Sequence, residues 1–237
     1  MKRALVIALL LAVAVPLLIA VADLPPHGSP DAPAHTHVAP RYLERGAEEA
    51  GAENIVTAVI LNYRGLDTLG EVTVIFTAMA AVLAVLVGAR AVTALDTPAS
   101  ALPVSMIVRF IVRVLAPFIV LFSIYVVLNG HVTPGGGFQG GTIAGALVIA
   151  LTLIMSDEQA ARLLPRRPER VLQAAAPLAF IMTGVTGLLL TGDFLGYPVG
   201  HESALVATLM LTFVEIGIGV GGAMVIATIF RTMGAGR

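Results

Sequence analysis

The sequence predicts an all-α integral membrane protein with about six transmembrane helices. Apolar residues make up 57% of the 237 positions, charged residues make up 12%, and the mean hydropathy is +0.93. A soluble domain carries roughly 25% charged residues, so an ordinary water-soluble fold is excluded. The sequence has no cysteine, which rules out disulfides, iron–sulfur clusters and thiolate metal sites in this chain. We expect a non-catalytic protein with no cofactor, no metal and no nucleic-acid partner.

Six apolar runs are long enough for the roughly 20 residues that a helix needs to cross a bilayer. They are residues 4–22, 69–87, 107–128, 142–155 with its glycine-rich approach, 171–190 and 203–230. Each run is predicted to be helical, because an isolated strand in lipid would leave its backbone groups without hydrogen bonds.

Basic residues predict the orientation of these helices. Of the 14 basic residues, 11 fall on one side: Lys2, Arg3, Arg90, Arg109, Arg113, Arg162, Arg166, Arg167, Arg170, Arg231 and Arg237. Most acidic residues and all five histidines fall on the other side. By the positive-inside rule, both termini are predicted to be cytoplasmic.

The first run also fits a second interpretation. Its basic start and the sequence Ala20-Val21-Ala22 are typical of a secretory signal peptide with an A-x-A cleavage site. Its apolar stretch of about 19 residues is longer than the 7–15 residues of a signal peptide, so a retained helix is favoured.

Residues 23–68 are predicted to form the one sizeable external segment. Residues 42–51 read as a short amphipathic surface helix, and residues 53–61 as an apolar segment at the membrane interface or against a partner. The histidines His27, His35 and His37 lack the ligand spacing of a metal site, so a solvated loop is the better interpretation.

Glu215 is the residue that most clearly suggests chemistry. It lies twelve positions after Ser203, which is about 18 Å along a helix and near the middle of a hydrocarbon core roughly 30 Å thick. A charged side chain there costs about 2.5–3.5 kcal/mol on insertion scales. Two interpretations stay open: a carboxylate that relays protons or sodium, and a protonated side chain hydrogen-bonded to a neighbouring helix. The following Gly217 and Gly221 form a GxxxG step, which predicts close helix packing.

Asp67 and Glu71 lie where the second apolar run begins. The spacing Thr68-x-x-Glu71 is typical of a capping box, and an acid there suits the helix dipole. The alternative is that Glu71 holds a proton or sodium ion at the outer side.

Two basic residues are weaker candidates. Arg109 and Arg113 share one face of the third helix, and Arg113, one turn deeper, needs a carboxylate or a water-lined path. His131 is a further candidate, in the loop that follows the third helix, although a lone loop histidine is usually without a role.

A glycine-rich segment joins the third and fourth helices on the outer side. It reads Asn129-Gly130-His131-Val132-Thr133-Pro134-Gly135-Gly136-Gly137-Phe138-Gln139-Gly140-Gly141. It lacks the Lys-Ser/Thr of a phosphate-binding loop, so nucleotide binding is rejected. We expect a loop that dips into the membrane and runs into a helix N-terminus, followed by small-residue packing steps at Gly137, Gly141 and Gly145.

This segment, together with Arg109-Phe110 through Pro117, resembles the B-type component of the Mrp multisubunit sodium/proton antiporters, a four-helix protein. The resemblance covers residues 104–237. A second one, carried by Asn54-Ile55-Val56-Thr57-Ala58-Val59 and Tyr63-Arg64-Gly65-Leu66-Asp67-Thr68-Leu69-Gly70-Glu71, is to the C-terminal end of the large A-type component and to the two-helix E-type component of archaeal hydrogenase-type complexes. It covers residues 1–92, and residues 93–103 then read as a linker.

These resemblances imply a membrane subunit in the prokaryotic cell membrane that takes part in Na+ and H+ exchange. The implied partners are the large A- and D-like and the small C-, E-, F- and G-like antiporter subunits. The resemblance also strengthens a functional role for Glu71, on which the family motif ends. A membrane-bound hydrogenase or formate-hydrogenlyase-like complex and a purely structural membrane protein are the alternatives.

Overall fold

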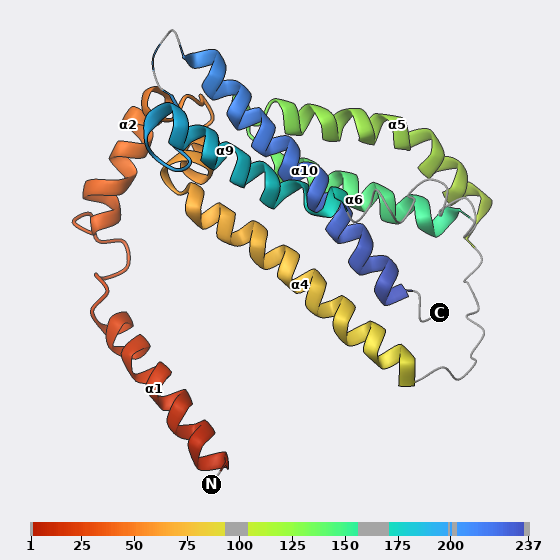
Figure 1. Cartoon of the computed structure of the whole chain (residues 1–237), viewed down its shortest axis with the longest axis horizontal. Coiled ribbons are helices and arrows are strands. Elements are labelled where there is room, and N and C mark those ends of the chain that lie inside the picture. The colour runs from red at the N-terminus through yellow and green to blue at the C-terminus, as the bar shows by residue number, and fades with distance from the viewer. Residues whose placement is uncertain (1, 93–103, 156–170, 199, 201–202, 235–237) are drawn as a thin grey trace. The chain divides into compact units, whose positions relative to one another are not determined.

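The computed structural model describes residues 2–92, 104–155, 171–198, 200 and 203–234, and this part of the chain is helical without strands (Figure 1). The predicted linker at 93–103 lies outside the described residues. The chain divides into two compact units, Met1–Glu44 and Arg45–Arg237.

In the first unit, helix α1 (Lys2–Ala22) contains Pro16 and exposes nearly all of its apolar side chains. Its 21 residues reach about 32 Å, enough to cross a bilayer. A short π-helix, η1 (Ala34–Val38), follows it. The amphipathic α2 (Ala39–Ala50) begins in this unit and ends in the next, which confirms the predicted surface helix.

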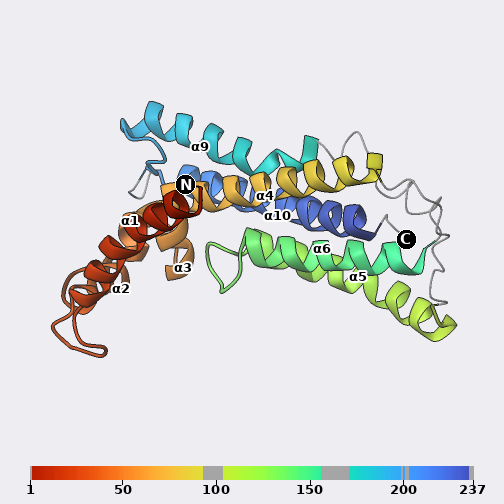
Figure 2. The ribbon, with the colours of Figure 1, turned by 90° about the horizontal axis from the view of Figure 1, so that it is seen from below.

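The second unit is a bundle built around one long helix. Short α3 (Ile55–Thr57) and π-helix η2 (Ala58–Tyr63) lead into α4 (Gly65–Val92). The remaining helices are α5 (Met106–Leu128), α6 (Gly137–Ile154), α9 (Ala175–Thr191) and α10 (Ala204–Gly234). Figure 2 shows α4 and α9 on one side of α10, and α5 and α6 on the other, and α10 contacts all four.

The observed helices confirm a membrane protein of about six spans. Among the described residues, five helices are long and apolar enough to cross a membrane, and the 17-residue α9 is a shorter apolar sixth. The fourth span was predicted at 142–155 with a glycine-rich approach. The observed helix begins at Gly137, so the last part of that approach is already helical. The cytoplasmic position of both termini stays a prediction.

Glycines allow the helices around α10 to approach closely. A Cβ at Gly221 would lie 2.9 Å from the Ala176 Cβ of α9, and a Cβ at Gly141 would lie 2.7 Å from the Gly219 carbonyl oxygen of α10. Gly217 likewise packs against Ala179. The packing roles predicted for Gly217 and Gly221 therefore match what the structure shows.

Residues 53–61 contribute to the core of the second unit. Thr57, Ala58 and Leu61 are fully buried, and Leu61 belongs to the same hydrophobic core as Phe180 and Leu211. Val56, in contrast, is 50% exposed. The predicted position of this segment at the membrane interface or against a partner stays a prediction.

Candidate functional site

Glu215 is enclosed at the centre of the second unit. Its side chain is 1% exposed, and it lies about 16 Å along α10 from Ala204 and about 24 Å from Arg231. The backbone N–H of Gly137 donates a hydrogen bond to Oε2. Its other oxygen, Oε1, is buried and has no hydrogen-bond partner among the described residues. A buried oxygen of this kind usually has a donor, so it marks a place where a proton, an ion or water can be held.

Two glycines let the loop at 129–136 lie directly against this carboxylate. A Cβ at Gly136 would lie 2.8 Å from Oε2, and one at Gly130 would lie 3.1 Å from Oε1. Gly136 also has φ +127°, a conformation that side chains rarely allow. Any larger residue at these positions would push the loop away from Glu215.

The loop at 129–136 ends at the N-terminus of α6, and the first backbone N–H of α6 contacts Glu215. This confirms the expectation that the loop runs into a helix N-terminus. The helix starts earlier than expected, with Gly136 as its N-cap. Its first five residues are Gly137, Phe138, Gln139, Gly140 and Gly141. The N-terminal end of a helix carries a partial positive charge, which stabilises a nearby carboxylate by about 0.3–2 kcal/mol. The arrangement therefore offsets part of the cost of a charge on Glu215.

Asn54 and Thr57 form hydrogen bonds to this loop. Asn54 donates through Nδ2 to the carbonyls of Gly130 at 2.8 Å and Thr133 at 2.9 Å, and its backbone N–H donates to the His131 carbonyl at 3.0 Å. Thr57 donates to the same Gly130 carbonyl at 2.6 Å. Neither residue was predicted as a site residue, although both belong to the Asn54–Val59 motif that carries the second resemblance. Asn54 also precedes a helix as an N-cap, where it accepts a hydrogen bond from the Val56 N–H.

Tyr197 is the second residue that the sequence did not point to. Its side chain is 5% exposed and its hydroxyl has no hydrogen-bond partner among the described residues. Burial raises the pKa of the Tyr197 phenol, and the nearby Glu215 carboxylate raises it further. The phenol therefore stays neutral and can act only as a hydrogen-bonding group. No sequence pattern marks it, because its role depends on the fold.

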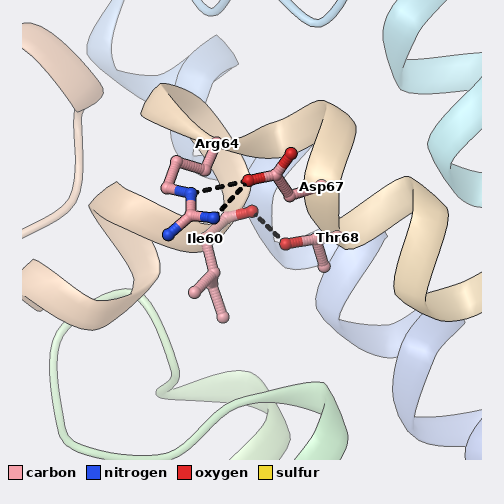
Figure 3. Close-up of polar contacts among 4 residues, drawn as sticks. All are labelled: Ile60, Arg64, Asp67 and Thr68. Carbon is pink, nitrogen blue, oxygen red and sulfur yellow. Dashed lines mark hydrogen bonds and ion pairs between the residues drawn. The ribbon is translucent and has the colours of Figure 1, made fainter. Parts of the chain in front are cut away.

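The predicted capping box at the start of α4 is wrong. The helix begins at Gly65, so Thr68 already lies in its first turn, and its hydroxyl donates to the Ile60 carbonyl at 2.6 Å (Figure 3). Asp67 pairs with Arg64 at 2.6 Å on the surface. The Thr68 hydroxyl therefore donates to the preceding π-helix, whereas a capping box would need its oxygen to accept from the Glu71 backbone N–H.

The other predicted site residues lie on α4, on α5 and in the loop at 129–136. Glu71 is exposed on α4, and no described residue forms an ion pair with it. Arg113 is exposed on α5, about 22 Å from the end of that helix at Leu128. His131 lies in the loop, and its carbonyl bonds to Asn54. Pro134 and Gly135 complete the loop, with Gly135 close to Val126.

Comparison with known proteins identifies the family to which this chain belongs. Residues 107–229, more than half of the chain, match the family described as a domain related to the MnhB subunit of Na+/H+ antiporters. The chain belongs to this MnhB-related family. Residues 4–100 match a second family, MbhE, which is the E-type component of MBH.

Two relatives show how far the likeness extends. An uncharacterised protein of Methanocaldococcus jannaschii is 28% identical over 177 residues, which is 68% of this chain and 66% of the relative. The B-type component of the Na(+)/H(+) antiporter of Bacillus subtilis is 33% identical over 96 residues, which is 40% of this chain and 66% of the relative. The chain thus spans 66% of the length of each.

Two solved structures resemble this MnhB-related chain over nearly its whole length. A chain of the membrane-bound sulfane sulfur reductase, an archaeal respiratory membrane complex, is 34% identical with a TM-score of 0.67, and the match covers 98% of this chain and 97% of that chain. A chain of the Mrp complex from Dietzia sp. is 28% identical with a TM-score of 0.62, and the match covers 97% of this chain and 26% of that chain.

Proposed function

We propose that this chain is a non-catalytic subunit of a multisubunit Na+/H+ antiporter module in the prokaryotic cell membrane, and that Glu215 is part of its proton or sodium pathway. The observation that carries the proposal is the 1% exposed Glu215, with one oxygen bonded to the start of α6 and the other unpartnered among the described residues. Intramembrane carboxylates are expensive and commonly functional. The family membership supports the antiporter assignment.

Glu71 is the second pathway residue in this proposal. Its carboxylate is exposed on a helix that is apolar enough to span a membrane. A charged group facing lipid is costly, so a neighbouring subunit or a water-filled passage between subunits is the environment that suits it. The pathway roles of Asp67, Arg113 and His131 stay predictions, since they rest on sequence position alone.

The test is Na+-driven proton exchange in everted membrane vesicles that contain the complete complex. Glu215→Gln is expected to lower exchange at least tenfold while the complex stays assembled, because Gln keeps the shape but cannot bind or release a proton. Glu48→Gln, a change to an exposed carboxylate on α2, is the matched control. Full exchange by an assembled Glu215→Gln complex would rule out the pathway role.

A second candidate function has its own support. The match to a chain of the respiratory sulfane sulfur reductase runs almost from end to end of both chains. The same subunit can therefore serve an antiporter module inside a respiratory complex. Purification of the complex in mild detergent with mass spectrometry separates the two functions: subunits that carry iron–sulfur or nickel–iron centres indicate the respiratory complex, and antiporter-like subunits alone indicate the antiporter.

A further inference from the structure

The hydroxyl of Thr57 and the carboxylate of Glu215 both lie against Gly130. Thr57 is fully buried and donates to the Gly130 carbonyl at 2.6 Å. A Cβ at Gly130 would lie 3.1 Å from Glu215 Oε1. Glu215 Oε1 meanwhile has no partner among the described residues.

The Gly130 carbonyl does not depend on Thr57 alone. The Asn54 side chain donates to the same oxygen at 2.8 Å, and it also donates to the Thr57 hydroxyl oxygen at 3.2 Å. The Thr57 hydrogen can therefore leave Gly130 without stranding a buried carbonyl. A hydroxyl is both a donor and an acceptor and turns about a single bond, so this change needs no movement of the backbone.

We propose that Thr57 is a positioning residue for Glu215 whose hydrogen bond to Oε1 reverses when Glu215 changes its protonation state. Protonated Glu215 donates from Oε1 to the Thr57 oxygen, while Thr57 donates to Gly130. When the proton leaves Oε1 for the water of the pathway, the Thr57 hydroxyl turns and donates to Oε1. Each polar group then keeps a partner in both states, which a buried site requires. This inference deepens the proposed pathway role of Glu215 and rests on it.

Few charged groups lie where they could stabilise ionised Glu215 in place of Thr57. Tyr197 interacts electrostatically with Glu215 and is neutral. Neither α6 nor α9 carries a charged side chain, and the loop contributes His131. On α4, Asp67 and Glu71 are exposed, as is Arg113 on α5. Among the described residues, the neutral side-chain donors near the carboxylate are therefore the hydroxyls of Thr57 and Tyr197, and Thr57 has the Gly130 carbonyl as a second acceptor.

The experiment measures protonation of Glu215 directly in the complete complex. Infrared difference spectra between low and high pH contain a carboxyl band of Glu215, which is identified by its loss in Glu215→Gln. Thr57→Val keeps the shape and removes the hydroxyl, so Glu215 loses a charge-assisted hydrogen bond in its ionised state and a weaker neutral one in its protonated state. The pH midpoint of this band is therefore expected to rise by about one pH unit, the difference between the two bonds. Thr57→Ser keeps the hydroxyl and is expected to leave the midpoint unchanged.

The control is Thr183→Val, which removes another buried hydroxyl at a threonine of α9 that lines a separate surface pocket. An unchanged midpoint in Thr57→Val, or an equal shift in Thr57→Ser or Thr183→Val, would overturn the proposal. If Thr57→Val does not assemble, Thr57→Cys, with a weaker donor, must give a shift of the same sign. The infrared band reports protonation of Glu215 whether or not the complex transports ions. An unshifted midpoint in Thr57→Val therefore refutes the role of Thr57. Normal Na+/H+ exchange by Glu215→Gln instead refutes the proposed pathway role of Glu215.

Discussion

The backbone N–H of Gly137 donates a hydrogen bond to the carboxylate of Glu215, so the first residue of α6 is tied to α10. The contact places a carboxylate at a helix N-terminus inside a membrane protein. It also sets the register of α6 against α10, since Gly141 and Gly145 pack one and two turns further along the same helix.

Gly137→Ala is expected to lower the stability of the second unit by about 1–3 kcal/mol, the usual cost of overpacking. A Cβ at this position would lie 2.6 Å from the Ile218 Cβ. Thermal unfolding of the purified complex measures the effect. Gly222→Ala on α10 is the control, because its Cβ would meet no atom within 4 Å. Equal melting temperatures for the two variants would contradict the close packing.

Thr68→Val is expected to cost about 1–3 kcal/mol, because the Ile60 carbonyl loses its buried donor. Thr68 is 2% exposed. Thr73→Val provides the comparison: Thr73 is exposed and bonds only to carbonyls of its own helix, so its replacement should change stability by less than about 0.5 kcal/mol. Protection of the backbone amides at 58–68 in hydrogen exchange should fall only in the Thr68 variant.

Asp67→Asn is expected to change stability by at most about 1 kcal/mol, as is usual for a surface ion pair. The Arg64 and Asp67 side chains are 61% and 55% exposed. Salt screens such pairs, so the difference between wild type and variant should shrink at high ionic strength. A large loss of Na+/H+ exchange with unchanged stability would instead assign Asp67 to the ion pathway.

Tyr197→Phe is expected to leave assembly intact and to stabilise the fold at alkaline pH. The folded state raises the pKa of Tyr197 above its ordinary value of 10, so the neutral phenol contributes stability that is complete below about pH 10 and is lost as the pH rises further. Phe cannot ionise and lacks this loss. Thermal melts at neutral and alkaline pH test the difference; a variant that melts earlier at neutral pH would show that the hydroxyl has a partner.

The sequence predicted the helices well because hydropathy governs them directly. The third span was predicted at 107–128 and is observed at Met106–Leu128. The packing glycines Gly217 and Gly221 were predictable for the same reason: small residues at helical spacing define a face without knowledge of what covers it.

Contacts between distant segments were not predictable. Asn54 and Gly130 are 76 positions apart, and nothing in either local sequence says that they meet. The capping box failed because the Thr68 hydroxyl can either accept from a backbone N–H of its own helix or donate to a distant carbonyl, and only the fold decides between them. Tyr197 was missed because burial of a loop residue depends on the helices that close over it.

The hydrogen bonds of Asn54 and Thr57 to the loop at 129–136 join the region matched by one family to the region matched by the other. Since one polypeptide carries both sides, the two sides meet as a tethered pair within one molecule. Two separate chains would have to form the same contacts by collision and be made in equal amounts. Fusion therefore makes closure of the Glu215 site independent of how much of each partner the cell produces.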